Sequence, residues 1–212
     1  MKVSRFTFNM FGVNTYILWD DISRDAIIVD PGMIDDKECK IIDDFIKNNK
    51  LRLKHLVNTH MHIDHSFGIG YMMQNYDLKL ECNIADQFLA ERLMQQAKMF
   101  GLPMLINELQ INVELNEGDC VTVGGEKLLI LHVPGHSPGS IVIYAPDSSF
   151  IISGDVLFNS SIGRSDLPGG NYRQLVGAIK EKLMILPDDT VVYPGHGMET
   201  TIGNEKRNNP YI

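Results

Sequence analysis

No stretch of the chain stays apolar over the roughly 18–20 residues that a membrane-spanning helix needs. Residues 1–6 are interrupted by polar side chains and lack the apolar core of a signal peptide. Cysteine is scarce: Cys39, Cys82 and Cys120 are widely spaced, and no Cys-x-x-Cys occurs. Three scattered thiols argue against a disulfide framework and against a sulfur-bound zinc ribbon. These absences favour a cytoplasmic protein that does not associate with membranes.

Positive charge is also in short supply. The chain has 19 Lys and Arg residues against 27 Asp and Glu residues, which gives a formal net charge of −8. Proteins that coat nucleic acid need clustered Lys and Arg to neutralise phosphates, so nucleic acid is not an expected partner. No linker, charge run or low-complexity segment marks a domain boundary. With 212 residues, 44% of them hydrophobic, we expect a single domain over 1–212 with a sizeable core.

Apolar periodicity predicts an α/β domain made of two β-rich halves. Strands are expected at 3–9, 14–19, 26–29, 55–58, 78–82, 121–123, 127–133, 140–144, 150–152 and 190–193. Helices are expected from 36 with Asp35 as cap, from about 66, over 85–98, and over 172–184 with Asn171 as cap. Residues 100–118 break the pattern and are either a connector or a lid over a site.

The two halves echo each other loosely. Each has a strand pair, then a helix, then a strand that ends near a histidine, at His60 in the first half and His196 in the second. We expect the halves to pack sheet against sheet with the helices outside. The strand ends would then meet along one edge of the molecule.

Residues 59–65, THMHIDH, give the strongest functional signal. His60, His62, Asp64 and His65 place three imidazoles and one carboxylate within six residues, directly after an expected strand. Short turns at the ends of strands commonly hold the side chains of functional sites. A histidine-rich surface loop without function is the alternative, and clusters of this kind rarely lack a function. We therefore predict that these four side chains belong to a site.

Three isolated residues occur in similar surroundings. His136 lies in VPGHSPG, Asp155 in SGD and His196 in PGHG, each after an apolar strand and beside Gly or Pro. Glycine lets the backbone approach closely and proline stiffens a turn. Imidazole and carboxylate ligands without thiolate suit zinc, iron(II) or manganese. Seven such ligands exceed the need of one tetrahedral ion, so two divalent ions that share a carboxylate fit the count.

These residues resemble the motif of the metallo-β-lactamase superfamily, His-x-His-x-Asp-His followed by a distant His, Asp and His. The resemblance spans nearly the whole chain and implies an αββα four-layer sandwich. It also implies ligands for two ions: His60, His62 and His136 for the first, Asp64, His65 and His196 for the second, and Asp155 as the bridge. β-Lactamases of the main zinc class carry Cys at the position of Asp155, which disfavours antibiotic hydrolysis.

Within this superfamily the chain is most similar to glyoxalase II-like hydrolases, especially a short bacterial form. The similarity rests on GDVLF at 154–158, GRSDLPGG at 163–170, PGHG at 194–197 and NEKRNNP at 204–210. In long glyoxalase II a basic residue near the position of Arg164 helps to hold the glutathione carboxylate, which implies a substrate-binding role for Arg164. An ion pair with Asp166 is the alternative. Long glyoxalase II also has a C-terminal helical domain that grips glutathione. Only sixteen residues follow His196, so we expect no such domain here.

The resemblance implies hydrolysis of a thioester such as S-lactoylglutathione by a hydroxide held between two divalent ions. We expect zinc first, with iron and manganese as alternatives. Asp64 is expected to bind the second ion and to hold and orient the proton of the hydroxide. A thiolate leaving group has a pKa near ~8.5, so no further general acid is required. The expected partner is a small-molecule thioester, and the sequence leaves the oligomeric state open.

Four other interpretations compete with this one. A persulfide dioxygenase of the same superfamily also carries the Gly-Arg-[Ser/Thr]-Asp stretch and uses one iron, here on His60, His136 and Asp155. A lactonase shares the fold. A processing ribonuclease shares the site, but the acidic balance argues against it. A non-enzymatic binding module would require a vestigial site, and the seven intact ligand positions argue against that.

Overall fold

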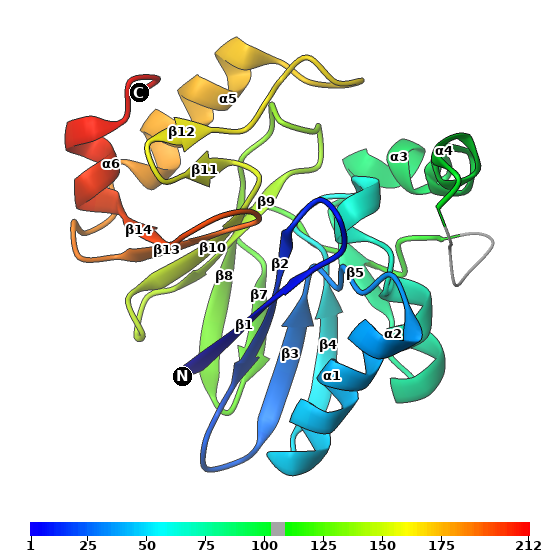
Figure 1. The fold of residues 1–212 in the computed structure, drawn as a ribbon. Helices are drawn as coiled ribbons and strands as arrows, with labels where there is room; N and C mark the ends of the chain where they lie inside the picture. Colours follow the sequence, from blue (N-terminus) through cyan, green and yellow to red (C-terminus); the bar gives the residue numbers. More distant parts are fainter. Residues whose placement is uncertain (103–108) are drawn as a thin grey trace.

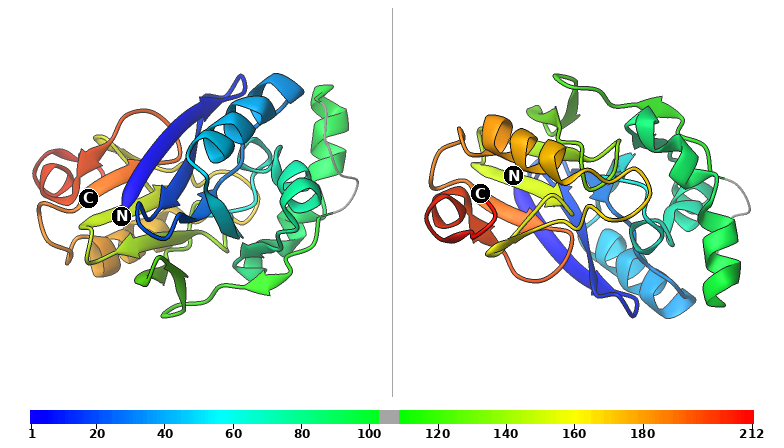
Figure 2. Two further views of the ribbon diagram at one scale, coloured as in Figure 1. Left: turned by 90° about the horizontal axis from the view of Figure 1, so that it is seen from below. Right: turned by 90° about the horizontal axis from the view of Figure 1, so that it is seen from above.

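The computed structural model describes residues 1–102 and 109–212. Two six-stranded sheets lie face to face, and helices cover both outer faces (Figures 1 and 2). This is the expected αββα sandwich, and it is an α/β fold because parallel and antiparallel strand pairs occur in both halves.

The first sheet has the order β1-β2-β3-β4-β5-β6 and the second the order β14-β13-β10-β9-β8-β7. The strands of the first sheet are β1 (Lys2–Phe8), β2 (Val13–Trp19), β3 (Asp25–Val29), β4 (Arg52–Val57), β5 (Leu80–Cys82) and β6 (Val113–Glu114). Those of the second are β7 (Cys120–Val123), β8 (Glu126–His132), β9 (Ile141–Ala145), β10 (Phe150–Gly154), β13 (Val191–Pro194) and β14 (Thr200–Thr201). A separate hairpin joins β11 (Leu157–Phe158) to β12 (Ser161–Ile162).

The helices divide between the two outer faces. They are α1 (Asp36–Asn48), α2 (Ile69–Tyr76), α3 (Gln87–Ala90), α4 (Leu93–Phe100), α5 (Tyr172–Ala178) and α6 (Ile202–Asn208). Apolar side chains of α1 to α4 pack on the first sheet, and those of α5 and α6 pack on the second. The caps agree with the sequence: Asp35 accepts from the first turn of α1, and Asn171 accepts from the first turn of α5. Within the described ranges, no helix is long and apolar enough to span a bilayer.

Alternation along the strands separates the layers. In β3, Ile27 faces the second sheet, whereas the next residue, Ile28, faces the helices outside. In β9, Ile141 faces the first sheet and Val142 faces α5. Strands that are buried on both faces read as continuously apolar in sequence, which is why β3 and β9 are easy to recognise.

One predicted helix is wrong. In place of a single helix over 85–98, the structure has a 3-10 turn at Ile84–Asp86, then α3, a break, and α4. Of the apolar side chains at helical spacing, Leu89 and Leu93 are buried, whereas Ala85 is exposed. Asp86 is fully buried, although a single helix over 85–98 would place it away from the face that carries Leu89 and Leu93. Its carboxylate accepts hydrogen bonds from two distant loops, and these tertiary contacts override the local periodicity.

Other differences are smaller. Residues 172–184 form α5 followed by a π turn at Ile179–Leu183, rather than one helix. The expected irregular stretch at 100–118 contains β6, which pairs with the edge of β5, while its residues 103–108 lie outside the described part of the chain. Sequence periodicity missed β11, β12, β14 and α6, because strands of two residues and a helix with few apolar residues carry little pattern.

Candidate metal centre

The predicted ligands meet at one edge of the sandwich, where strands from both sheets end. The segment 59–65 follows β4 of the first sheet, whereas His136, Asp155 and His196 follow β8, β10 and β13 of the second. Strands β8, β10 and β13 run in one direction, so their carboxyl ends lie at the same edge. Loops beyond the carboxyl ends of strands are the usual location of sites in α/β folds.

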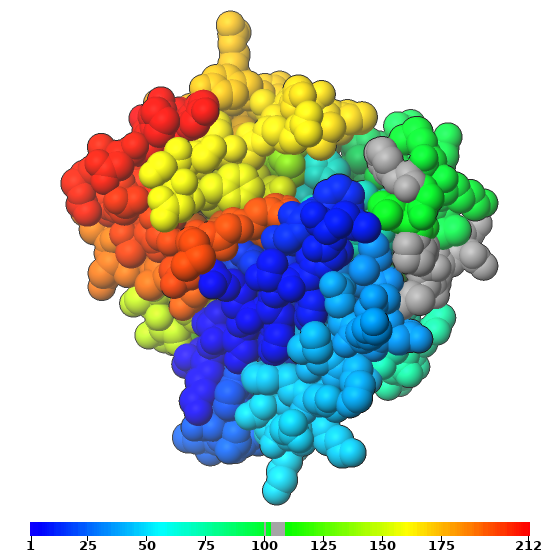
Figure 3. Space-filling view, in the orientation of Figure 1, coloured from blue at the N-terminus to red at the C-terminus, as the bar shows by residue number. Residues whose placement is uncertain are grey.

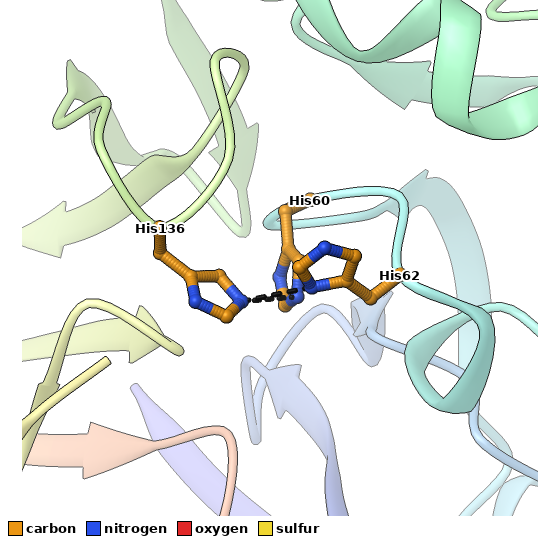
Figure 4. Close-up of side chains that lie close together, drawn as sticks. All are labelled: His60, His62 and His136. Atoms are coloured by element: carbon orange, nitrogen blue, oxygen red, sulfur yellow. Dashed lines mark hydrogen bonds between the residues drawn. The ribbon is translucent and has the colours of Figure 1, made fainter. Parts of the chain in front are cut away.

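His60, His62 and His136 form what we call the three-histidine cluster. Nε2 of His136 lies 2.9 Å from Nδ1 of His62 and 3.2 Å from Nε2 of His60. Figure 4 shows the rings reaching toward one another from the loops after β4 and β8. All three ligand atoms lie within 4.8 Å of one another, as ligands of one ion would.

The outer partners of two of these rings fix which nitrogen is free. Nδ1 of His136 lies 2.7 Å from the backbone carbonyl of Arg164, which only accepts, so Nδ1 carries the proton. The Thr59 hydroxyl donates to Asp30 and therefore accepts from Nδ1 of His60 at 3.1 Å. In both rings the lone pair of Nε2 faces the cluster. Outer acceptors of this kind orient metal-binding imidazoles.

Asp64, His65 and His196 form a second group, the aspartate–histidine cluster. Nε2 of His196 lies 3.1 Å from Oδ2 of Asp64, and Nε2 of His65 lies 3.6 Å from the same oxygen. Here too, outer acceptors hold Nδ1: the Asp30 carboxylate at 3.0 Å from His65, and the Phe11 carbonyl at 3.1 Å from His196. The Nε2 atoms of both rings therefore face Asp64.

Asp155 lies between the two clusters. Its Oδ1 is 3.4 Å from Nε2 of His65, and its Oδ2 is 3.7 Å from Nε2 of both His136 and His196. Asp155 thus faces members of both clusters, and it also forms a group with His60 and His65 whose ligand atoms lie within 4.8 Å of one another. A carboxylate in this place could contribute to a cation held by either cluster.

The three-histidine cluster is held in its neutral form. Burial, with the neighbouring imidazoles, keeps the pKa of His60 well below its usual range. Burial and His136 lower the pKa of His62 to about 3. Burial also lowers the pKa of His136, although Asp155 opposes the shift. Neutral imidazole is the form that binds metal.

The aspartate–histidine cluster has the opposite electrostatics. Burial disfavours a charged His65, but Asp64, Asp155 and Asp30 outweigh it and raise the pKa of His65 well above its usual range. Burial is likewise outweighed at His196, where the hydrogen bond with Asp64 raises the pKa. Burial opposes ionisation of Asp155, but His65 holds its pKa below the usual range. These carboxylates attract positive charge, and protons occupy the place where a cation would act.

The chemistry of the donors fits divalent cations. Within the described part of the chain, Nε2 of His65 and Oδ1 of Asp155 are buried and have no hydrogen-bond partner. Buried polar atoms in native proteins are rarely left unpaired. Imidazole and carboxylate donors suit zinc, iron(II) and manganese alike, so the donor set does not choose among them.

Two glycines beside the ligands are required by close approach. A Cβ at Gly195 would lie 2.2 Å from Oδ1 of Asp155 and 2.8 Å from Cε1 of His65. Gly154 has φ of +48°, and a Cβ there would lie 2.3 Å from Oγ1 of Thr59. The expectation that glycine beside the ligands permits close backbone approach is confirmed at both positions.

Sequence reasoning missed Asp30, which supports both clusters. It is fully buried after β3, with φ of +50°, and accepts from the backbone and hydroxyl of Thr59 and from Nδ1 of His65. The DPG sequence at 30–32 indicated only a turn. The available signal was its position directly after an apolar strand, which is the same context as Asp155.

Backbone contacts hold His196 in place. The β1–β2 loop meets the segment after β13 at the surface (Figure 3). At the start of β2, the side-chain amide of Asn14 donates to the backbone carbonyls of Pro194 and Gly197. The Asn14 N–H donates to the carbonyl of Gly195 at 2.7 Å. A distant N-terminal strand therefore fixes the last of the predicted ligands.

The side chain of Arg164 forms the ion pair that was the alternative to substrate binding. Its Nε and one terminal nitrogen donate to Asp166, each at 2.8 Å. Both side chains are exposed, at 61% and 69%. The backbone of Arg164 contacts the site through the carbonyl that accepts from His136, and the guanidinium touches none of the seven predicted ligands among the described contacts.

A family model described as the metallo-beta-lactamase superfamily matches residues 9–196. The chain belongs to this superfamily. Among curated proteins, hydroxyacylglutathione hydrolase GloC of Haemophilus influenzae is 37% identical over 213 residues, which cover 100% of this chain and 98% of that protein.

Solved structures are similar over almost the whole chain. The BLEG-1 B3 metallo-beta-lactamase has a TM-score of 0.87 at 30% identity and covers 99% of both chains. TTHA1623 in a di-iron-bound form has a TM-score of 0.86 at 32% identity, with 99% of this chain and 100% of that one covered. ETHE1 from Myxococcus xanthus has a TM-score of 0.81 at 27% identity, with 99% and 84% covered. The fold predicted from the resemblance is confirmed.

Proposed function

We propose that this protein is a metal-dependent thioesterase of the glyoxalase II type, acting on S-lactoylglutathione or a related hydroxyacyl thioester. The observation that carries the proposal is the place of Asp155, whose two oxygens face the two clusters. Such a site suits two divalent ions, with zinc as the first candidate and iron supported by the di-iron form of TTHA1623. Likeness to GloC over the full chain supports the thioester.

Most of the site residues would bind the metal ions or orient the residues that bind them. The three-histidine cluster and the aspartate–histidine cluster would each hold one ion, with Asp155 between them. When bound, such a pair lowers the pKa of water toward ~7 and polarises a carbonyl. Thr59, Asp30 and the Arg164 carbonyl keep three imidazoles aimed at the site, so that little rearrangement is needed.

Asp64 is the residue we propose to hold and orient the proton of the attacking water. Its side chain is 17% exposed, whereas that of His65 is fully buried. Its Oδ2 is engaged by His196 at 3.1 Å, which fixes the direction of the carboxylate. A carboxylate that is fixed at one oxygen and open to solvent is placed to hold a proton at the other.

The leaving group makes a separate general acid unnecessary. A thiolate has a pKa near ~8.5 and departs without full protonation near neutral pH. A small-molecule thioester therefore needs little from the protein beyond the site described. We further propose that the protein works in the cytoplasm, in keeping with its three free cysteines.

One experiment separates this proposal from its rivals. The protein is purified without added metal, bound metal per chain is measured, and a panel of S-lactoylglutathione, a simple acyl thioester, a lactone, a β-lactam and glutathione persulfide is assayed. We expect about two ions per chain and thioester hydrolysis well above the other activities. One iron per chain with oxygen consumption on the persulfide would instead establish a dioxygenase. Fastest turnover of the lactone or the β-lactam would refute the thioester proposal in a different way.

A further inference from the structure

Asp86 is a buried carboxylate to which the proposed reaction gives no role. It ends the short turn after β5, and none of its surface is exposed. Its Oδ2 accepts from the Met61 N–H at 3.0 Å and from the Ser137 hydroxyl at 2.7 Å. Its Oδ1 accepts from the Gly139 N–H at 2.6 Å. These are its side-chain hydrogen bonds among the described residues.

The three donors lie on the two loops that form the three-histidine cluster. Met61 is the residue between His60 and His62, and Ser137 directly follows His136. One loop leaves β4 of the first sheet and the other leaves β8 of the second. A single carboxylate therefore joins the two sheets where the three-histidine cluster is assembled.

The contact is close on both sides. A Cβ at Gly139 would lie 2.7 Å from Cγ of Asp86, so the loop approaches the carboxylate as only glycine allows. Burying a carboxylate is unfavourable unless hydrogen bonds compensate, and an apolar residue would fill a core position with less loss. The use of Asp86 here points to a demand for geometry rather than for stability.

We propose that Asp86 is a positioning residue that holds the three-histidine cluster ready for its ion, without contacting that ion. This inference rests on the proposed function, which assigns one ion to each cluster. It predicts that Asp86 affects the first ion selectively. The aspartate–histidine cluster does not depend on Asp86, because its outer partners are Asp30 and the Phe11 carbonyl.

The variant Asp86→Asn tests this with little change in shape. An amide has one acceptor oxygen, so in either orientation its NH₂ faces a donor and at least one of the three hydrogen bonds is lost. We use Co²⁺ as the probe and measure its affinity by competition with a chelator in two backgrounds. His196→Ala leaves the three-histidine cluster intact, and His62→Ala leaves the aspartate–histidine cluster intact.

In the His196→Ala background we expect Asp86→Asn to lower Co²⁺ affinity about 10- to 100-fold, the range for outer partners of metal ligands. In the His62→Ala background we expect a change of less than about twofold. A merely structural role would lower both affinities alike, and that result would overturn the inference. Unchanged affinity in both backgrounds would overturn it as well.

Glu205→Gln is the matched control. Glu205 is also fully buried and accepts from the Ser160 N–H at 2.9 Å and the Asn209 amide at 2.7 Å, but its partners lie in the C-terminal half. We expect it to lower the Tm while both Co²⁺ affinities stay near the parent values. A selective loss of the first ion in this control would show that burial alone explains the Asp86 effect.

Two further measurements distinguish failure of this inference from misfolding of the variant and from failure of the proposed function. If Asp86→Asn does not fold, Ser137→Ala removes one of the three donors and is expected to weaken only the first ion, about threefold to tenfold for one hydrogen bond. The unmodified protein is titrated in parallel. If it binds no Co²⁺ at either cluster, the proposed function fails; if it binds two ions and Asp86→Asn does so equally well, only this inference fails.

Discussion

The two halves of the metal centre differ in how they favour a cation. The three-histidine cluster consists of neutral imidazoles, buried at His60 and His136 and half-buried at His62, whose pKa values are lowered by their burial. The aspartate–histidine cluster has carboxylates beside it and imidazoles whose pKa values are raised by them. The first cluster suits a cation because its neutral imidazoles already lie close together, and the second because its carboxylates attract positive charge. A cation at either cluster would therefore meet different competition from protons.

The halves also differ in access. His60 and His136 are 1% and 2% exposed, whereas the side chain of His196 is 27% exposed. Asp64 is also partly exposed, but His65 beside it is fully buried, and His62 of the three-histidine cluster is half-buried. The proposed proton acceptor, Asp64, is thus a partly exposed carboxylate.

The largest effect on metal binding and turnover is expected at Asp155, because this residue belongs to both halves of the centre. Asp155→Ala removes the carboxylate that faces both clusters, so both ions should be weakened and turnover should fall by more than about 100-fold, beyond the range for outer partners. Metal per chain and kcat/KM are the measurements. Asp188→Ala, at an exposed carboxylate paired with Lys206, should change neither. A fully metallated and active Asp155→Ala would refute the bridging role.

The next effect concerns Asp30, an outer carboxylate that serves both halves. Asp30→Asn weakens its hydrogen bonds to Thr59, which supports His60, and to His65 directly. We expect the affinity for both ions to fall about 10- to 100-fold, in contrast with the selective effect expected of Asp86→Asn. Metal titration with chelator competition measures it. Loss of only one ion would show that Asp30 belongs to one cluster.

Much of this centre could be predicted from sequence. The segment 59–65 concentrates ligands locally, and His136, Asp155 and His196 each follow an apolar strand beside glycine or proline, a context that surface residues do not need. The layers were predictable for a similar reason, because buried strands are continuously apolar. A residue could be predicted from sequence where the residues next to it in the chain indicate its role.

Asp30 and Asp86 could not be found in this way. Both lie in sequences that read as a turn or as the polar face of a helix, and both act through donors that are distant in the chain. Arg164 shows the same limit in another form, because its carbonyl, which sequence does not distinguish from any other, is the group that orients His136. Such partners are decided by tertiary packing, to which periodicity is blind.

The contrast in electrostatics predicts a contrast in pH dependence. The raised pKa of His65 means that the aspartate–histidine cluster must release a proton to bind an ion, so its affinity should rise with pH about tenfold per unit per proton displaced. The three-histidine cluster is already neutral, with the pKa of His62 at about 3, so its affinity should be nearly flat from pH 8 to pH 5, roughly. Calorimetric titration in buffers of different ionisation enthalpy counts the protons.

The same two pKa shifts also predict how the folding stability of the metal-free protein depends on pH. A raised His65 pKa contributes stability that is present below the unfolded value of about 6.5 and is lost as pH rises through the folded pKa. A lowered His62 pKa acts the other way, so stability is lost as pH falls from about 6.5 toward the folded value. If the affinities of the two clusters for metal changed equally with pH, or if the three-histidine cluster released protons on binding metal, the predicted difference between the clusters would be contradicted.

The smallest effect is expected at Arg164, at the rim of the centre. Arg164→Ala removes the guanidinium but keeps the carbonyl that orients His136, so metal content should be unchanged. If the side chain exchanges Asp166 for a substrate carboxylate, KM for S-lactoylglutathione should rise by up to about fivefold, since exposed charge pairs are worth at most about 1 kcal/mol. KM for an uncharged thioester should stay constant, and kcat should stay within about twofold for both. Asp166→Ala, which frees the guanidinium, is the matched control and should lower KM for the charged substrate only. Equal KM changes for the two substrates would mean that the ion pair with Asp166 is the whole role of this side chain.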